Sequence, residues 1–194
     1  MWKSLLMAAK QKTSPGPVLI SAGRRVDAAD ATVFRFPASE VAAVRRKIQR
    51  LFAKEKPRAV VCSAACGADL LVLDVALARH TERYVLLPSE QEEFRKTSVA
   101  DRPGDWEKLY DRVLETSKVE VLKLAEGQEG YLQTNRKLLD RGQELARKYS
   151  VPAAALVVWN KQSRGPDDVT GHFLEQAKLR NLPVIEISTL SPAK

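Results

Sequence analysis

With 194 residues, the chain has the length of one domain and can bury a substantial apolar core. Its hydrophobic share of 44% and charged share of 29% are ordinary globular proportions, which exclude a fibrous or low-complexity protein. A formal net charge of +8 favours an anionic partner, such as a nucleotide, a nucleic acid or a membrane surface, without choosing among them.

Residues 1–16 are predicted to form an N-terminal tail, because their apolar run is too short for a signal-peptide core. No stretch approaches the length of a membrane-spanning helix, so no membrane partner is expected. Two cysteines, Cys62 and Cys66, are too few for a disulfide framework, which indicates a cytoplasmic protein. Its single domain is predicted to span residues 17–194, with no metal site and no cofactor.

Six short apolar runs alternate with helical stretches along the chain. The runs are typical of strands whose two faces are both covered by helices, as in parallel sheets. The pattern predicts an α/β fold, a Rossmann-like, doubly wound and mostly parallel sheet of about six strands with helices on both faces. The predicted strands are 18–22, 59–63, 84–87, 119–122, 154–159 and 184–187, and the predicted helices are 41–52, 70–77, 131–149 and 173–179.

Four of these runs, around Val18, Val60, Leu86 and Val157, are predicted to form adjacent central strands. In an open parallel sheet, ligands bind outside the carboxyl ends of the strands, where the strand order reverses. The loops that follow the strands are therefore the segments to search for function.

The first of these loops begins with Gly23, Arg24 and Arg25. A glycine directly after a buried strand allows a sharp turn or the close approach of a ligand. Two arginines behind it can bind phosphate or carboxylate with two parallel hydrogen bonds. The loop continues to Pro37, which is long for a simple connection and favours function over a plain turn with solvated arginines.

The second loop is the most informative and consists of small residues. Small side chains allow an anion to approach the N–H groups of a helix N-terminus, where the helix dipole also favours negative charge. Gly67 and Ala68, with Arg24 or Arg25, are therefore predicted to form a phosphate subsite. Asp69 is expected to cap the helix or to bind a ribose hydroxyl, and close packing of helix on sheet is the structural alternative. The candidate ligand-binding residues here are Ser63, Ala64, Ala65, Cys66, Gly67, Ala68 and Asp69.

The third loop follows the strand that ends at Leu87. Ser89 is predicted to cap a helix, because Glu92 three residues later completes a capping box. Pro88, Arg95 and Thr97 are candidate ligand-binding residues in this segment.

The fourth loop joins the fifth predicted strand to the last helix. Asp168 or Thr170 is expected to cap that helix. Trp159, at the end of the strand, either stacks on a base or packs in the core. The candidate ligand-binding residues here are Trp159, Gly165, Asp168 and Thr170.

Read together and in this order, the segments 21–25, 63–69 and 88–99 resemble the SLOG superfamily, which includes the DNA-processing protein DprA and the LOG-type phosphoribohydrolases. Trp106 and Asn135 also fall where such proteins carry recurring residues, and the resemblance adds Asn135 to the candidate ligand-binding residues.

The chain is similar in particular to bacterial SLOG modules that sense nucleotide-derived signals, some of them beside cyclases or in defence systems. The resemblance covers about residues 17–188. It implies a Rossmann-like fold and a nucleotide-derived small molecule as partner, and it leaves open a homo-oligomer and an effector protein encoded nearby.

Three functions remain in competition at this point. The favoured one is a module that binds or senses a nucleotide or nucleotide-derived ligand at the carboxyl ends of the strands. The second is an N-glycosidic hydrolase of nucleoside 5′-monophosphates, with Asp69, Glu90 or Glu175 as candidate catalytic groups. The third is a single-stranded nucleic-acid binder like DprA, which charge alone supports.

One departure from the LOG-type enzymes weighs against hydrolysis. Those enzymes carry a Pro-Gly-Gly-x-Gly-Thr-x-x-Glu loop, whereas this chain has Gly165-Pro-Asp-Asp-Val-Thr170. Glu175 follows Thr170 by five residues instead of three, which moves it to another face of the helix. The expectation therefore leans towards a protein that is not an enzyme.

Overall fold

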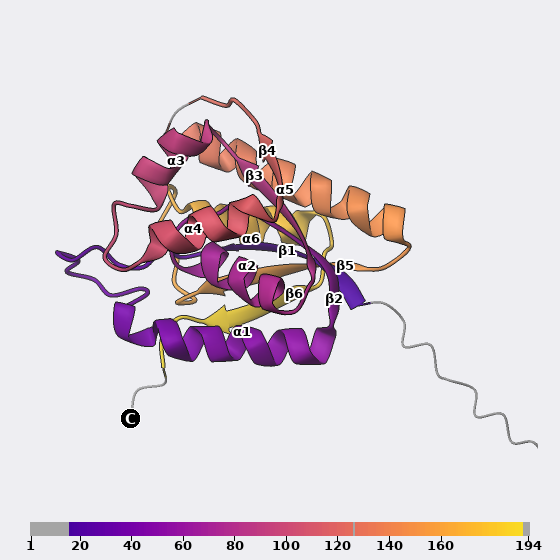
Figure 1. Cartoon of the computed structure of the whole chain (residues 1–194), viewed down its shortest axis with the longest axis horizontal. Helices are drawn as coiled ribbons and strands as arrows, with labels where there is room; N and C mark the ends of the chain where they lie inside the picture. The colour runs from indigo at the N-terminus through magenta and orange to yellow at the C-terminus, as the bar shows by residue number, and fades with distance from the viewer. Residues whose placement is uncertain (1–15, 126, 192–194) are drawn as a thin grey trace, which may run out of the picture.

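A computed structural model of the chain describes residues 16–125 and 127–191, so the predicted tail lies outside the described residues except for Gly16. The described residues form one six-stranded sheet with helices between its strands (Figure 1). The elements are β1 (Gly16–Gly23), η1 (Ala38–Glu40), α1 (Val41–Glu55), β2 (Pro57–Cys62), α2 (Ala68–Ala78), β3 (Glu82–Leu87), α3 (Gln91–Ser98), α4 (Trp106–Glu115), β4 (Lys118–Val121), α5 (Gln128–Tyr149), β5 (Ala153–Trp159), α6 (Val169–Leu179) and β6 (Val184–Ser188).

The sheet confirms the predicted fold class. Its order is β4-β3-β2-β1-β5-β6, and every pair of neighbouring strands is parallel. Val18, Val60, Leu86 and Val157 lie on four adjacent central strands, as predicted. The chain runs outwards from β1 to β4 and then returns to β5 on the other side of β1. The order therefore reverses between β1 and β5, where ligands bind in folds of this kind.

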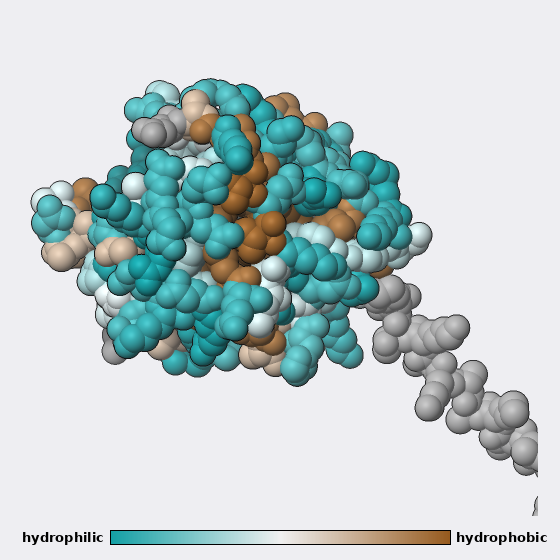
Figure 2. All heavy atoms as spheres, turned by 45° about the horizontal axis from the view of Figure 1, so that its top comes forward, coloured by the Kyte–Doolittle hydropathy of each residue, from teal (hydrophilic) through white to brown (hydrophobic). Residues whose placement is uncertain are grey.

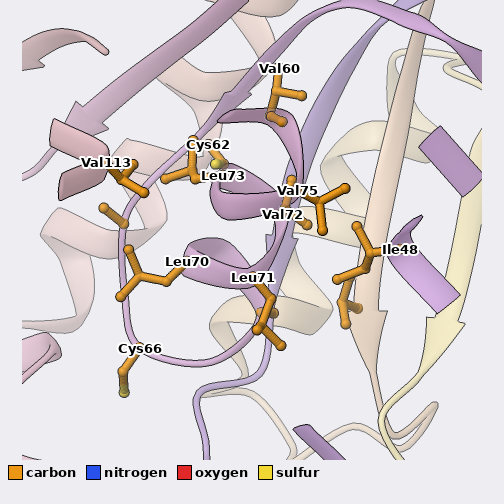
Figure 3. Close-up of a cluster of buried hydrophobic side chains, with 14 of the residues drawn as sticks. Ile48, Val60, Cys62, Cys66, Leu70, Leu71, Val72, Leu73, Val75 and Val113 are labelled. Atoms are coloured by element: carbon orange, nitrogen blue, oxygen red, sulfur yellow. The ribbon is translucent and has the colours of Figure 1, made fainter. Parts of the chain in front are cut away.

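Alternate residues of the central strands face opposite helical layers. Leu19 of β1 and Val60 of β2 are buried in a cluster with side chains of α1, α2 and α4, part of which Figure 3 shows. Val18 and Ile20 of β1 pack instead with side chains of α5 and α6. Because successive strand residues point to opposite faces, strands apolar at nearly every position need both layers.

Two helical features differ from the sequence-based prediction. Helix α4 was not predicted, although Trp106, Tyr110 and Val113 recur at helical spacing and are buried. The prediction of Ser89 as a helix cap is wrong, since α3 is preceded by Glu90, whose side chain makes no capping hydrogen bond. The residue that precedes the helix is Glu90, one position after Ser89, so the predicted capping box does not form.

Membrane insertion by a helix finds no support in this fold. Among the described residues, no helix combines the length and the apolar character that crossing a bilayer requires. Hydrophilic residues also dominate the face of the molecule that Figure 2 shows.

Helix α5 lies close to β1 because of a glycine. A side chain at Gly142 would overlap with the side chain of Ile20, which is fully buried in β1. The missing side chain therefore lets the helix approach the centre of the sheet.

We expect Gly142→Ala to lower the free energy of unfolding by about 1–2 kcal/mol, because overpacking a core outweighs the better helix propensity of alanine. Denaturant unfolding measures the change. Lys137→Ala, at an exposed position of the same helix, is the control and should leave stability nearly unchanged. A Gly142→Ala variant as stable as the control would contradict this packing.

Candidate functional site

A cavity of about 510 Å³ opens at the carboxyl ends of β1, β2 and β5, beside the point where the strand order reverses. Pockets of this size accommodate small-molecule ligands. The lining residues are Ala22, Gly23, Arg24, Arg25, Val26, Asp27, Ala28, Ala31, Val33, Arg35, Ser63, Ala65, Asp69, Phe94, Ser98, Arg102, Gln128, Tyr131, Thr134, Asn135, Leu138, Arg164, Asp167, Val169 and Thr170.

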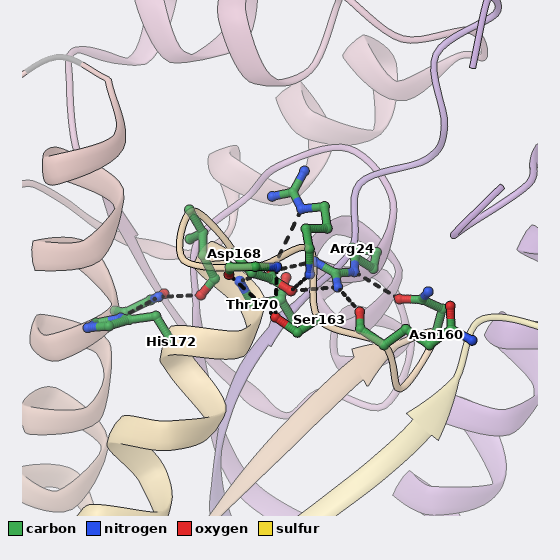
Figure 4. A network of polar contacts seen from close by, with 11 residues as sticks. Arg24, Asn160, Ser163, Asp168, Thr170 and His172 are labelled. Atoms are coloured by element: carbon green, nitrogen blue, oxygen red, sulfur yellow. Dashed lines mark hydrogen bonds and ion pairs between the residues drawn. The ribbon is translucent and has the colours of Figure 1, made fainter. Parts of the chain in front are cut away.

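Arg24 forms the central polar contact beside this cavity. Its guanidinium group donates to both carboxylate oxygens of Asp168, with N···O distances of 2.5 and 2.8 Å, and both side chains are buried. Its Nε donates to the Asn160 side chain at 3.1 Å (Figure 4), and Nη2, which also binds Asp168, donates to the Gln162 carbonyl at 2.6 Å. Since every guanidinium nitrogen has a partner, Arg24 holds the loop after β1 against the loop after β5 and has little capacity left for a ligand.

Asp168 also caps helix α6. Its carboxylate accepts a hydrogen bond from the Thr170 N–H at 3.1 Å, which confirms Asp168 as the cap of α6. It also accepts from the Arg164 N–H at 2.9 Å. Burial disfavours the ionised carboxylate, but hydrogen bonds from Arg24 and from backbone N–H groups outweigh it and hold the pKa of Asp168 at about 2.

The other arginines of the cavity are less completely neutralised. Arg25 and Arg102 share the carboxylate of Asp101. Arg164 reaches Asp168 only at 3.8 Å, and that carboxylate already binds Arg24 in bidentate fashion. Two carboxylates thus pair with four arginines.

Arg35 adds to this positive charge from the loop between β1 and α1. Among the residues that the structure describes, its side chain makes no ion pair. Burial lowers the pKa of Arg164, and the neighbouring charges of Arg24, Arg35 and Arg25 lower it further. The cavity wall therefore carries a cluster of guanidinium groups that repel one another.

Asp69 is the buried acid of the cavity. It lies in the first turn of α2, its side chain is almost completely buried, and its Oδ1 atom has no hydrogen-bond partner. Burial raises the pKa of Asp69 to about 7, against the lowering effects of the Ala65 N–H and the charge of Arg25. The carboxyl group is therefore largely neutral in mildly acidic solution.

The loop between β1 and α1 forms one side of the cavity and is closed at its base. The Asp27 carboxylate accepts from the N–H groups of Arg35 and Phe36, each at 3.0 Å, and the Asp27 N–H donates to the Phe36 carbonyl. The segment between these residues protrudes at the left of Figures 1 and 2. It exposes Val33 and Phe34, with 56% and 64% of their surface accessible.

The N-terminus of α2 differs from the predicted phosphate subsite. The helix begins at Ala68 as expected, but the Ala68 N–H donates to the Arg24 carbonyl at 3.0 Å and is not free. Gly67 has a φ of +94°, and a side chain there would press against backbone atoms of Val26 and Arg24. The small residues thus allow the loop after β1 to pack on the helix, and neither Gly67 nor Ala68 lines the cavity.

The structure separates the remaining candidate residues into two groups. Those that line the cavity, besides the two arginines already described, are Gly23, Ser63, Ala65, Asp69, Asn135 and Thr170. Those outside its lining are Ala64, Cys66, Gly67, Ala68, Pro88, Glu90, Arg95, Thr97, Trp159, Gly165, Asp168 and Glu175.

Several residues of the second group have structural partners. The Trp159 indole donates to Glu186 at 2.6 Å and is buried, so its ring is not free to stack on a ligand. Arg95 pairs with Glu107 and Asp111 on the surface. Cys62 and Cys66 are buried free thiols, and burial raises the pKa of both. No group of three metal-ligating side chains occurs within residues 16–125 and 127–191.

Sequence reasoning missed several residues that line the cavity. Arg35 and Val33 lie in the loop between β1 and α1, whose length indicates function but whose sequence does not single out these two residues. Tyr131 and Thr134 lie on the face of α5 that also carries Asn135, one turn apart at helical spacing. Arg102 lies in the connection between α3 and α4, where no local pattern indicates its position.

Removing one partner of the Arg24–Asp168 pair should destabilise the protein strongly. We expect Asp168→Asn to lower the free energy of unfolding by about 3–5 kcal/mol, because it leaves a buried guanidinium without its counter-ion. Asp111→Asn breaks an exposed pair with Arg95 and should cost below about 1 kcal/mol. Urea unfolding compares the two variants, and similar losses would refute the structural role of the buried pair.

The raised pKa of Asp69 predicts a pH-dependent stability. Between about pH 4 and 7 the folded state holds a proton on Asp69 that the unfolded chain has released, so the contribution of Asp69 to stability is greatest at low pH and falls as pH rises towards 7. The contribution of this group is on the order of 4 kcal/mol over that range. Unfolding of wild type and Asp69→Asn at several pH values measures it, and parallel pH profiles of the two proteins would contradict it.

Comparison with known proteins finds similarity only among solved structures. No protein-family profile matches the chain, and no curated protein matches it. DprA from Streptococcus pneumoniae is similar at 13% identity and a TM-score of 0.41, over 88% of this chain and 58% of that one. DprA from Helicobacter pylori, described with its single-stranded DNA binding mode, is similar at 16% identity and a TM-score of 0.39, over 88% and 76%.

Proposed function

We propose that the cavity binds a nucleotide or a nucleotide-derived anion, and that the protein is a binding or sensing module. The observation that carries this proposal is that five arginines line the cavity against three aspartates, Asp27, Asp69 and Asp167. The five arginines are Arg24, Arg25, Arg35, Arg102 and Arg164. Asp168 pairs with Arg24 and Arg164, Asp101 pairs with Arg25 and Arg102, and Arg35 forms no ion pair among the described residues.

A bound phosphate would relieve the repulsion among these arginines. Burial and neighbouring positive charges lower the pKa of Arg164, which means that its charged form is destabilised. An anion between Arg164 and Arg35 supplies the missing counter-charge and accepts charge-assisted hydrogen bonds. Guanidinium groups match phosphate oxygens in geometry, which favours this class of ligand.

The rest of the lining suits a base and a ribose. Phe94 and Leu138 are buried apolar residues of the lining, while Tyr131, Asn135 and Thr134, all on α5, carry polar groups. An apolar wall with a few convergent polar groups is the usual composition of a small-molecule site. The cavity therefore offers separate surfaces for the charged and the aromatic parts of a nucleotide.

A hydrolase acting on the N-glycosidic bond is the second candidate, and one observation favours it. Asp69 lines the cavity and titrates near neutral pH, as a general acid or base must. Glu90 and Glu175 are exposed and lie outside the lining, so they do not supply a second carboxyl group there. Incubation with AMP and chromatography for free adenine distinguishes turnover from binding.

The binding proposal is tested with a panel of AMP, ADP-ribose and cyclic di-AMP. A ligand that binds only the folded state raises the melting temperature, so a thermal-shift screen identifies the best probe. Calorimetry then compares wild type with Arg35→Gln and Arg164→Gln, which should weaken binding about 10-fold or more through loss of charged hydrogen bonds.

Arg46→Gln is the matched control for these variants. Arg46 is exposed on α1 and lies outside the cavity lining, so its removal should leave the affinity unchanged. Absence of binding by the whole panel, or equal weakening by all three substitutions, would overturn the proposal. A single-stranded dT oligonucleotide forms a separate arm, and binding of it alone would favour a nucleic-acid ligand instead.

A further inference from the structure

Three aspartates are buried in the structure, and their partners differ. Asp168 pairs with Arg24, and Asp74 pairs with Arg45 and Arg112. Asp69, by contrast, makes no ion pair among the described residues, although it lines a cavity whose wall is rich in arginine. A buried polar atom without a partner calls for an explanation, and a ligand-binding role is one of the few available.

The surroundings of Asp69 contain few groups that could compensate its charge. From α2 and the loop before it, the Ala65 N–H donates a hydrogen bond to the carboxyl group. Arg25, from the loop after β1, acts on it through its charge but pairs with Asp101. From β2, the Cys62 thiol is kept protonated, because burial and then the charge of Asp69 raise its pKa.

The wider cavity adds charges of both signs at other points of its wall. Arg102 faces it from the connection between α3 and α4, and Arg164 and Asp167 face it from the loop after β5. Asp27 and Arg35 belong to the loop between β1 and α1. None of these cations forms an ion pair with Asp69 in the part of the chain that the structure describes.

We propose that Asp69 recognises the ligand in its neutral form, donating a hydrogen bond to an acceptor atom of the bound nucleotide, so that binding takes up a proton. This inference rests on the proposed function and names the residue that makes the site selective for the ligand's acceptor pattern. Asp69 would act as a specificity-determining residue and not as a counter-ion.

Two physical effects favour the neutral carboxyl group in the complex. A ligand that fills the cavity displaces water and further desolvates Asp69, which disfavours its ionised form. The negative charge of the ligand acts in the same direction. Because the pKa of Asp69 in the free protein is already about 7, the proton uptake would fall at and above neutral pH.

By linkage, a ligand that raises the pKa of a group binds more tightly where that group is protonated. The affinity for an anionic nucleotide should therefore fall as pH rises above 7, by up to about tenfold per pH unit. The charge of the probe itself stays constant in this range, because the second phosphate pKa is about 6.

The test is calorimetric titration of the whole chain with AMP and cyclic di-AMP between pH 6.5 and 9. At pH 8, each titration is repeated in HEPES and in Tris, whose different ionisation enthalpies report the number of protons exchanged. Wild type should take up a fraction of one proton per ligand and lose affinity with rising pH. Release of a proton, or no exchange, would overturn the inference, and this readout needs no variant.

Asp69→Asn and Glu175→Gln complete the experiment. The asparagine keeps a hydrogen-bond donor without a titrating proton, so it should bind with a pH-independent affinity and take up no proton. Glu175 is exposed and outside the cavity, and its variant should behave as wild type. Proton uptake that persists in Asp69→Asn would assign it to another group and refute the inference. If neither probe binds at any pH, the proposed function fails and this inference fails with it, whereas binding without proton uptake overturns only the inference.

Discussion

The buried ion pair between Arg24 and Asp168 is the interaction on which the site depends. Its partners are 144 residues apart in sequence and belong to the loops that follow β1 and β5, the two strands between which the strand order reverses. The same aspartate caps α6, so one carboxylate fixes the loop, the helix and the opposite strand end. Ion pairs in this setting contribute position more than net stability, since desolvation offsets much of their attraction.

The pair between Arg24 and Asp168 limits the ion pairs that the other arginines of the cavity can form. Because Asp168 is already bound in bidentate fashion, Arg164 is left at the edge of its reach, and Arg25 and Arg102 share one carboxylate. Asp101 and Asp168 therefore each serve two arginines, while Arg35 has no ion-pair partner among the described residues. The proposed anion would supply counter-charge to these arginines.

Asp69 adds a titratable acid to the same cavity. A buried acid without a counter-ion is unfavourable unless it is protonated. Because Asp69 lies in a wall that contains arginines, a bound anion would change its protonation state. Binding and turnover place different demands on such a group. A sensor needs only a donor of fixed geometry, whereas a hydrolase needs a proton that can leave.

The architecture follows from the sequence alone, because apolar runs such as 154–159 form strands that must be buried on both faces. The sequence also located the edge of the sheet where the cavity opens, since that follows from strand direction. It did not distinguish Arg24 from Arg25, adjacent residues of the same type, of which one is buried against Asp168 and the other reaches Asp101 on the surface side. Only the tertiary structure decided this, because the fate of each arginine depends on which carboxylates distant loops bring within reach, and no local spacing encodes those distances.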